Sequence, residues 1–243
     1  MLLRIYMYLL KILTHFKAME INFNNICFFD CETTGLPPRG AKWDVDYNDF
    51  PNIVQLAWAV NRHNNNYIVY PDGWLIPEES IRVHGITAQR AYEEGVKFEV
   101  VAEAFVEDCL NSNLLVGHNI YFDTSVIKAM ILRVLGQDWY DRHSVECALY
   151  KGKRFDTMRS IIKFVGARYA NGKRGKFPSL AELHEKLFPG KVFGAHDAME
   201  DVKAVMRCYK ALIEMRIIDE PVPEQMITED VCLELLNASK NGF

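Results

Sequence analysis

The stretch ICFFDCETTG at residues 26–35 is the starting point for predicting the fold. Its first residues are apolar and largely aromatic, which predicts a buried strand, and the polar turn residues that follow end this strand. Asp30 and Glu32 lie two residues apart at its end, so both side chains leave the same face, with Cα atoms roughly 6.5 Å apart. Two carboxylates this close repel each other unless a cation lies between them.

The loop after the strand has its own signals. Gly35 frees the backbone to turn sharply, and the hydroxyls of Thr33 and Thr34 can hold the loop. Cys31, between the two acids, is expected to be a packing residue only.

The remaining periodicity indicates an α/β domain. Two further strands are predicted at 52–61 (NIVQLAWAVN) and 66–76 (NYIVYPDGWLI), joined by a hairpin turn in NRHNNN. Helical patterns and one short strand follow, with the strand at 114–118 and the helices at 97–111, 124–135, 157–165, 179–187 and 198–216. Strands followed by alternating helices and a strand predict a mixed sheet.

Two helix starts carry capping boxes. Ser179 with Glu182, and Asp197 with Glu200, have the required spacing. The second cap places His196 just outside a helix, on a loop that can move, and Asp201 in the first turn of that helix.

Two further motifs carry polar residues near helix starts: GHNIYFD at 117–123 and HDAMED at 196–201. Taken alone, Asp123 is more often a helix cap, Asp201 a favourable acid in a first turn, and His196 an ordinary loop histidine. The order of the three motifs along the chain, however, favours a joint role for these residues in one site.

The sequence D-x-E-T-T-G, then G-H-N-x-x-F-D, then H-x-x-x-x-D resembles the DEDD exonuclease superfamily. It is similar to the histidine subtype, whose members include epsilon-type proofreading subunits, ribonuclease T and oligoribonuclease. The resemblance covers roughly residues 24–215. It implies a ribonuclease H-like α/β fold, with a mixed five-stranded sheet flanked by helices and the site at the carboxylate-rich edge of the sheet. It also implies a metal-dependent 3′→5′ exonuclease that releases nucleoside 5′-monophosphates from DNA.

By position, the resemblance implies that Asp30, Glu32 and Asp201 coordinate one divalent ion. Asp30 would also touch a second ion, and Asp123 would contribute mainly through water. Oxygen-only ligands favour Mg²⁺ or Mn²⁺, and two ions per site are expected. His196 would be the general base, since an unperturbed imidazole titrates near about pH 6.5.

The resemblance also implies contacts with the substrate. Leu36 and Ile86 would pack against the terminal base, although both could equally be core residues. His84, Thr34 or Asn119 would lie near the sugar or phosphate, and Thr33 is also expected to contact the substrate.

Length and composition favour one catalytic domain over 19–218, because 243 residues with 49% hydrophobic content can bury one full core. Residues 1–18 are interpreted as a leader or extension of unclear role, too short in their apolar run for a membrane span. Residues 219–243 are interpreted as a tail with a short helix that packs back onto the domain, in preference to docking a partner. The six scattered cysteines lack C-x-x-C spacing and suit a reducing cytoplasm.

The net charge of −4 does not by itself indicate a protein that binds nucleic acid. The segment 151–191 nevertheless holds 11 Lys and Arg against 3 Asp and Glu, which is consistent either with a solvated face or with phosphate steering. The expected partner is single-stranded nucleic acid or 3′ ends, with DNA favoured, and a role as a DNA polymerase subunit stays open. The alternatives are an RNA-trimming enzyme, a non-catalytic binding module and an unrelated metal phosphoesterase.

Overall fold

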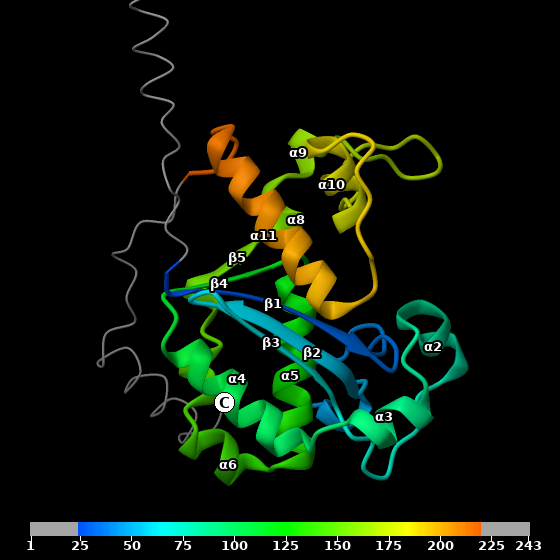
Figure 1. Ribbon diagram of the computed structural model, residues 1–243, viewed down its shortest axis with the longest axis vertical. Helices are drawn as coiled ribbons and strands as arrows, with labels where there is room; N and C mark the ends of the chain where they lie inside the picture. Colours follow the sequence, from blue (N-terminus) through cyan, green and yellow to red (C-terminus); the bar gives the residue numbers. More distant parts are fainter. Residues whose placement is uncertain (1–23, 220–243) are drawn as a thin grey trace, which may run out of the picture.

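The structure is a computed structural model that describes residues 24–219. Five strands form one mixed sheet in the order β3-β2-β1-β4-β5, with helices on both of its faces (Figure 1). The strands are β1 (Ile26–Thr33), β2 (Ile53–Val60), β3 (His63–Ile68), β4 (Leu114–Gly117) and β5 (Arg154–Asp156). β1 pairs antiparallel with β2 and parallel with β4. The prediction of a mixed five-stranded sheet flanked by helices is therefore confirmed.

Four of the helices are eight residues or longer: α4 (Phe98–Leu110), α5 (Ile120–Val134), α10 (Leu180–Leu187) and α11 (Ala198–Glu214). The shorter helices are η1 (Tyr47–Asp49), α2 (Glu78–His84), α3 (Ala88–Glu94), α6 (Gln137–Arg142), α7 (Val145–Ala148), η2 (Lys151–Lys153), α8 (Thr157–Ser160) and α9 (Ile162–Val165). Within residues 24–219, no helix combines the length and the apolar character needed to cross a membrane.

The two faces of β1 contact different helices, because side chains alternate along a strand. Phe29 lies on one face and packs edge-on against Phe105 of α4, with 5.1 Å between ring centroids. Phe28 lies on the other face and packs against Tyr209 of α11 at 5.6 Å. Asp30 and Glu32 share the face of Phe28, so the start of α11 lies near the two acids.

One strand, β3, begins and ends well before its predicted bounds, and another, β5, was not predicted. β3 occupies His63–Ile68, because Asn61 and Arg62 alone make the hairpin turn, with φ values of 49° and 70°. Positive φ at both central residues is what a two-residue hairpin of type I′ requires. β5 was not predicted, since a strand of three residues shows no readable alternation.

Helix boundaries also differ from the predictions. The predicted helix at 157–165 is interrupted at Ile161, which is fully buried and separates α8 from α9. α2 and α3 were not predicted, because helices of seven residues give little periodic signal. α5 begins at Ile120, before the predicted residue 124, so Asp123 lies inside its first turn.

The capping predictions hold in one case fully and in the other in part. Ser179 and Glu182 form both hydrogen bonds of a capping box. Asp197 caps α11 by accepting the backbone N–H groups of Met199 and Glu200 at 3.1 Å, but the Glu200 side chain pairs with Lys203 instead of completing the box. The predicted leader at 1–18 and most of the predicted tail at 219–243 lie outside the described residues.

Candidate active site

Asp30 and Glu32 lie near the C-terminal end of β1, the central strand of the sheet. In the antiparallel register, Asp30 is opposite Ala57 and Glu32 is opposite Gln55. Small Ala57 leaves room for α11 to approach this face, where Ala57 packs in the same cluster as Ala198 and Val202. The two acids thus lie on the central strand of the sheet, toward its C-terminal end.

Asp123 reaches the same region from the first turn of α5. Its carboxylate is buried and accepts two hydrogen bonds from Cys31, one from the backbone N–H and one from the thiol, both at 3.1 Å. Asp123 does not cap a helix, and Cys31 is more than a packing residue, because it fixes the orientation of this carboxylate. The sequence could not reveal the contact, which joins residues 92 positions apart.

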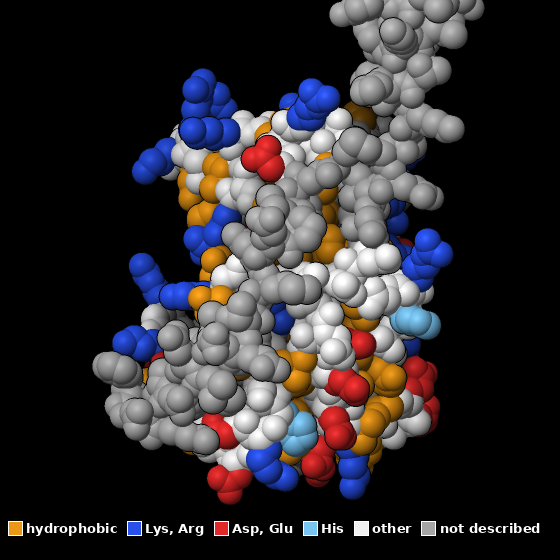
Figure 2. Space-filling view, turned by 90° about the vertical axis from the view of Figure 1, so that its left-hand side faces the viewer, with side chains coloured by type: hydrophobic (Ala, Val, Ile, Leu, Met, Phe, Trp, Pro, Cys, Tyr) orange, Lys and Arg blue, Asp and Glu red, His pale blue; other side chains and the backbone are white. Residues whose placement is uncertain are grey.

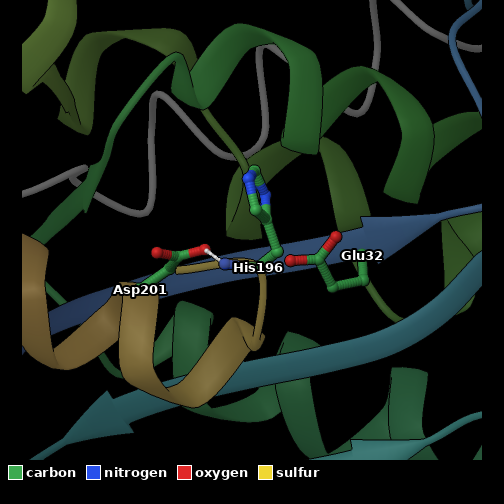
Figure 3. Close-up of side chains that lie close together, drawn as sticks. All are labelled: Glu32, His196 and Asp201. Carbon is green, nitrogen blue, oxygen red and sulfur yellow. Dashed lines mark hydrogen bonds between the residues drawn. The ribbon is translucent and has the colours of Figure 1, made fainter. Parts of the chain in front are cut away.

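His196 and Asp201 come from the start of α11. The backbone N–H of His196 donates to Oδ2 of Asp201 at 3.0 Å, and His196 has a left-handed φ of 69°. Figure 3 shows His196 between Glu32 and Asp201, with this hydrogen bond drawn. One ligand atom from each of these three residues lies within 4.8 Å of the others. The first and third sequence motifs, which contain Glu32 and His196 with Asp201, therefore meet in space.

Burial raises the pKa of all four carboxylates, and for Asp30 and Glu32 the neighbouring acids raise it further. Burial, together with the charges of Asp201 and Asp123, raises the pKa of Glu32 to about 8. Burial raises the pKa of Asp123 to about 7 and that of Asp201 to about 6. The pKa of Asp30 is raised well above its usual value by burial and by the three neighbouring acids.

These acids have no cationic partner among the ion pairs of residues 24–219. Like charges held together in a partly dehydrated site are costly unless protons or a cation neutralise them. Oxygen donors of this kind suit hard divalent cations such as Mg²⁺ or Mn²⁺. The residues present therefore fit a site for such ions.

Gln55 is a buried residue beside the site that sequence reasoning missed. Its Oε1 accepts the backbone N–H of Ala198 at 3.1 Å, and its Nε2 donates to Oδ2 of Asp197 at 3.3 Å and to Oδ1 of Asn66 at 2.9 Å. This amide joins the sheet to the N-terminus of α11, which carries Asp201. A glutamine inside a strand pattern offers no sequence signal for that role.

The two threonines of the first motif hold the loop, as predicted. Thr33 donates its hydroxyl to the carbonyl of Gly35 at 2.7 Å, and the Thr34 hydroxyl accepts the backbone N–H of Asn52 at 2.9 Å. Both hydroxyls thus make bonds within the protein.

The other residues expected to contact substrate differ in exposure. Leu36 is 82% exposed, whereas Ile86 is 1% exposed and packs in a core cluster, so Ile86 would need to move to meet a base. His84 accepts the Ile86 N–H at Nδ1, and its Nε2 is buried without a hydrogen-bond partner in the described part of the chain. Asn119 has φ of 68°, and its backbone N–H donates to Asp156 Oδ1 at 3.0 Å.

Comparison with solved structures supports the fold. A product-bound structure of exonuclease I gives a TM-score of 0.59 at 19% identity, covering 81% of this chain and 45% of that chain. A complex of E. coli exonuclease I with a dA16 oligonucleotide gives 0.57 at 19% identity, covering 80% and 42%. The ribonuclease H-like fold expected from the resemblance is thus confirmed.

Comparison of sequences identifies the family. DNA polymerase III subunit epsilon of Buchnera aphidicola subsp. Baizongia pistaciae (strain Bp) is 31% identical over 98 residues, 40% of this chain and 39% of that protein. The chain thus spans less than half the length of the relatives it matches. The model of the RNase_T exonuclease family matches residues 27–209, which contain all three motifs. The chain therefore belongs to this exonuclease family, within the DEDD exonuclease superfamily.

Proposed function

We propose that this chain is a metal-dependent 3′→5′ exonuclease of the histidine subtype, which hydrolyses terminal phosphodiester bonds of DNA and releases nucleoside 5′-monophosphates. The proposal rests on one observation: in a chain of the exonuclease family, one side-chain ligand atom from each of Glu32, His196 and Asp201 lies within 4.8 Å of the other two. Residues 19–218 are proposed as the catalytic domain.

Asp30, Glu32, Asp123 and Asp201 are the proposed metal ligands, for two Mg²⁺ or Mn²⁺ ions. Two such ions would supply charge stabilisation for both the attacking water and the leaving 3′ oxygen of an in-line displacement. The protein's contribution is to hold four acids close together: the rigid strand β1 supplies two of them and the first turns of α5 and α11 supply the others. Cys31 orients one of these acids, and Gln55 fixes the helix that carries another.

His196 is the proposed general base. Its backbone is anchored by the bond to Asp201, while its side chain is exposed and can turn toward the attacking water. A neutral imidazole at this position would take the proton of the water as the oxygen attacks phosphorus. The proton then lies on His196 and can pass to solvent.

DNA is the proposed substrate, because the relatives include a DNA polymerase subunit and exonuclease I bound to a DNA oligonucleotide. The exposed Leu36 would contact the terminal base, and the unpaired Nε2 of His84 would donate to an oxygen of the terminal nucleotide. The same phosphodiester chemistry acts on RNA, so the test includes both polymers.

The test uses single-stranded DNA and matched RNA, each labelled at the 5′ end, with Mg²⁺, Mn²⁺ or a chelator. The expected result is a metal-dependent ladder of shortened labelled DNA, because digestion from the 3′ end leaves the label on the remaining strand. His196→Ala should lose about 10²-fold or more in rate, the size typical of a general base, and Asp30→Asn should lose at least about as much because it removes a metal ligand.

Two matched variants act as controls. Asp72→Asn and His63→Ala change exposed residues of the same types outside the site and should keep wild-type rates. Immediate release of a labelled mononucleotide would contradict the polarity, and activity in the chelator would contradict the metal requirement. Faster shortening of RNA than of DNA would make RNA the substrate. If folded protein shortened neither polymer, the catalytic proposal would fail and a non-catalytic binding module would take its place.

A further inference from the structure

An exposed group of aromatic and basic side chains lies beside the candidate site. The Arg159 guanidinium carbon is 5.0 Å from the ring centroid of Tyr121 and 5.3 Å from that of Phe177. These residues come from α8, from the first turn of α5 and from the segment before α10. Tyr121 is 44% exposed and Phe177 43% exposed, so parts of both rings are open to solvent. We call these three residues the aromatic patch.

The aromatic patch is connected to the carboxylates of the site. Tyr121 precedes Asp123 by two residues in the first turn of α5. Nε of Arg159 is 3.4 Å from Oδ2 of Asp156, and Oδ1 of Asp156 accepts the backbone N–H of Asn119, the N-cap residue of α5. The position of Arg159 is thus coupled to the helix turn that carries Asp123.

The patch leads to a basic loop. An isolated bridge joins Arg168 to Arg174, and the short loop it closes precedes Phe177 by a few residues. Arg168, Lys173 and Arg174 are all exposed. Figure 2 shows a different face of the molecule, the left-hand side of Figure 1, on which Lys and Arg lie mainly in the upper part and Asp and Glu gather lower down. A polyanion leaving the site over the patch would therefore meet favourable charge.

The aromatic patch lies toward the β5 edge of the sheet, whereas His84 and Ile86, two of the residues expected near the terminal nucleotide, lie toward the β3 edge. The cluster that contains Ile86 packs on β2 and β3 residues, whereas α8 directly follows β5 at the other edge of the sheet. Figure 1 shows α2 and α8 well separated. A strand whose 3′ end is held on the α2 side would therefore continue over α8.

We propose that Tyr121, Arg159 and Phe177 form a subsite for single-stranded DNA on the 5′ side of the scissile bond. A base stacks on an exposed ring face, and the Arg159 guanidinium contacts a backbone phosphate. Aromatic rings interleaved with arginine are the recurrent way in which proteins hold unpaired strands without sequence preference. This inference rests on the proposed function, and it names the part of the protein that distinguishes long substrates from minimal ones.

Two substrates separate the subsite from the catalytic centre. The first is the p-nitrophenyl ester of thymidine 5′-monophosphate, which has a terminal nucleotide and no upstream nucleotide. The second is a single-stranded oligothymidylate of about twenty residues, long enough to cover a typical single-strand site. The variants are Tyr121→Leu, Phe177→Leu and Arg159→Ala, with Tyr121→Phe keeping the ring and Arg142→Ala changing an exposed arginine of the distant helix α6.

The expected result is a KM for the oligonucleotide that rises about 5- to 150-fold in Tyr121→Leu and Phe177→Leu, the range for loss of one stacked base. The ester should keep its wild-type kcat/KM in every variant. Tyr121→Phe and Arg142→Ala should match wild type on both substrates. In Arg159→Ala, the slope of log kcat/KM against log salt for the oligonucleotide should become shallower by about 0.7, the loss of one phosphate contact on a single strand.

The outcomes that overturn the proposal differ from those that overturn the function. Unchanged oligonucleotide KM in all three variants, with both substrates hydrolysed, would overturn the subsite alone. Equal losses on the ester and the oligonucleotide would also overturn it, because the residues would then support the centre itself. Hydrolysis of neither substrate by the wild-type protein would overturn the proposed function, and the subsite with it.

Discussion

Two polar clusters in this molecule handle buried charge in opposite ways. The carboxylate cluster consists of Asp30, Glu32, Asp123 and Asp201. The lysine cluster consists of Lys128, Glu146, Tyr140 and Trp43. In the carboxylate cluster all charges have the same sign and the pKa values are raised. In the lysine cluster the Lys128 ammonium and the Tyr140 hydroxyl both pair with the Glu146 carboxylate.

The contacts of the lysine cluster are short and specific. Nζ of Lys128 is 2.6 Å from Oε2 of Glu146, which also accepts the Tyr140 hydroxyl at 2.6 Å. The Lys128 ammonium lies 4.7 Å from the Trp43 ring centroid, over a ring that stacks on Tyr140. Burial lowers the pKa of Lys128 to about 8, whereas Lys128 and Tyr140 hold the pKa of Glu146 below its usual value despite burial. We interpret this cluster as structural and the carboxylate cluster as functional.

The largest expected effect is a loss of stability in the lysine cluster. Lys128 is 2% exposed, so Lys128→Met leaves Glu146 without its cation in a partly buried place, and such a change costs about 3–5 kcal/mol. Urea denaturation measures this free energy of unfolding. Lys210→Ala, which breaks an exposed pair with Glu214, should cost less than about 0.5 kcal/mol. Comparable losses in both variants would show that burial does not distinguish the two pairs.

The carboxylate cluster should respond in the opposite direction. Asp123→Asn keeps the oxygen that accepts from Cys31 and removes one charge, so the metal-free protein should gain about 1–3 kcal/mol at pH 8. Its nuclease activity should fall with the same change. Because folding raises the pKa of Asp123 from 3.8 to about 7, the wild-type protein loses stability as pH rises from 3.8 to about 7, and the gain should shrink steadily as pH falls below 7. A variant less stable than wild type at pH 8 would contradict this interpretation.

The smallest expected effect is the pH dependence of stabilisation by Mg²⁺. The raised pKa values of Glu32, Asp123 and Asp201 are about 8, 7 and 6, so protons compete with the cation increasingly as pH falls from about 8, and all three acids are largely protonated below pH 6. Saturating Mg²⁺ should therefore raise Tm by about 2–4 °C more at pH 8 than at pH 5.5, equivalent to roughly 1 kcal/mol in a domain of this size. Differential scanning fluorimetry measures the shift, and an equal shift at both pH values would argue against metal binding at these acids.

Much of the fold could be predicted from local pattern. The apolar run before Asp30 predicted β1, and the 3.6-residue periodicity predicted α4, α5, α10 and α11, because long amphipathic segments bury one face wherever they pack. Short elements escaped prediction. β5 and α7 have three and four residues and are stabilised by their neighbours in space, so their own sequences contain almost no periodic signal.

The site divides in a similar way. The sequence by itself determined which residues are acids, their spacing along β1 and at the start of α11, and the identity of His196, because motif spacing is a local property of the chain. Only the tertiary structure decided that Cys31 holds Asp123, that Gln55 ties β2 to α11, and that Tyr121, Arg159 and Phe177 meet. Such contacts join residues far apart in the chain, and their geometry depends on how helices and strands pack around one core.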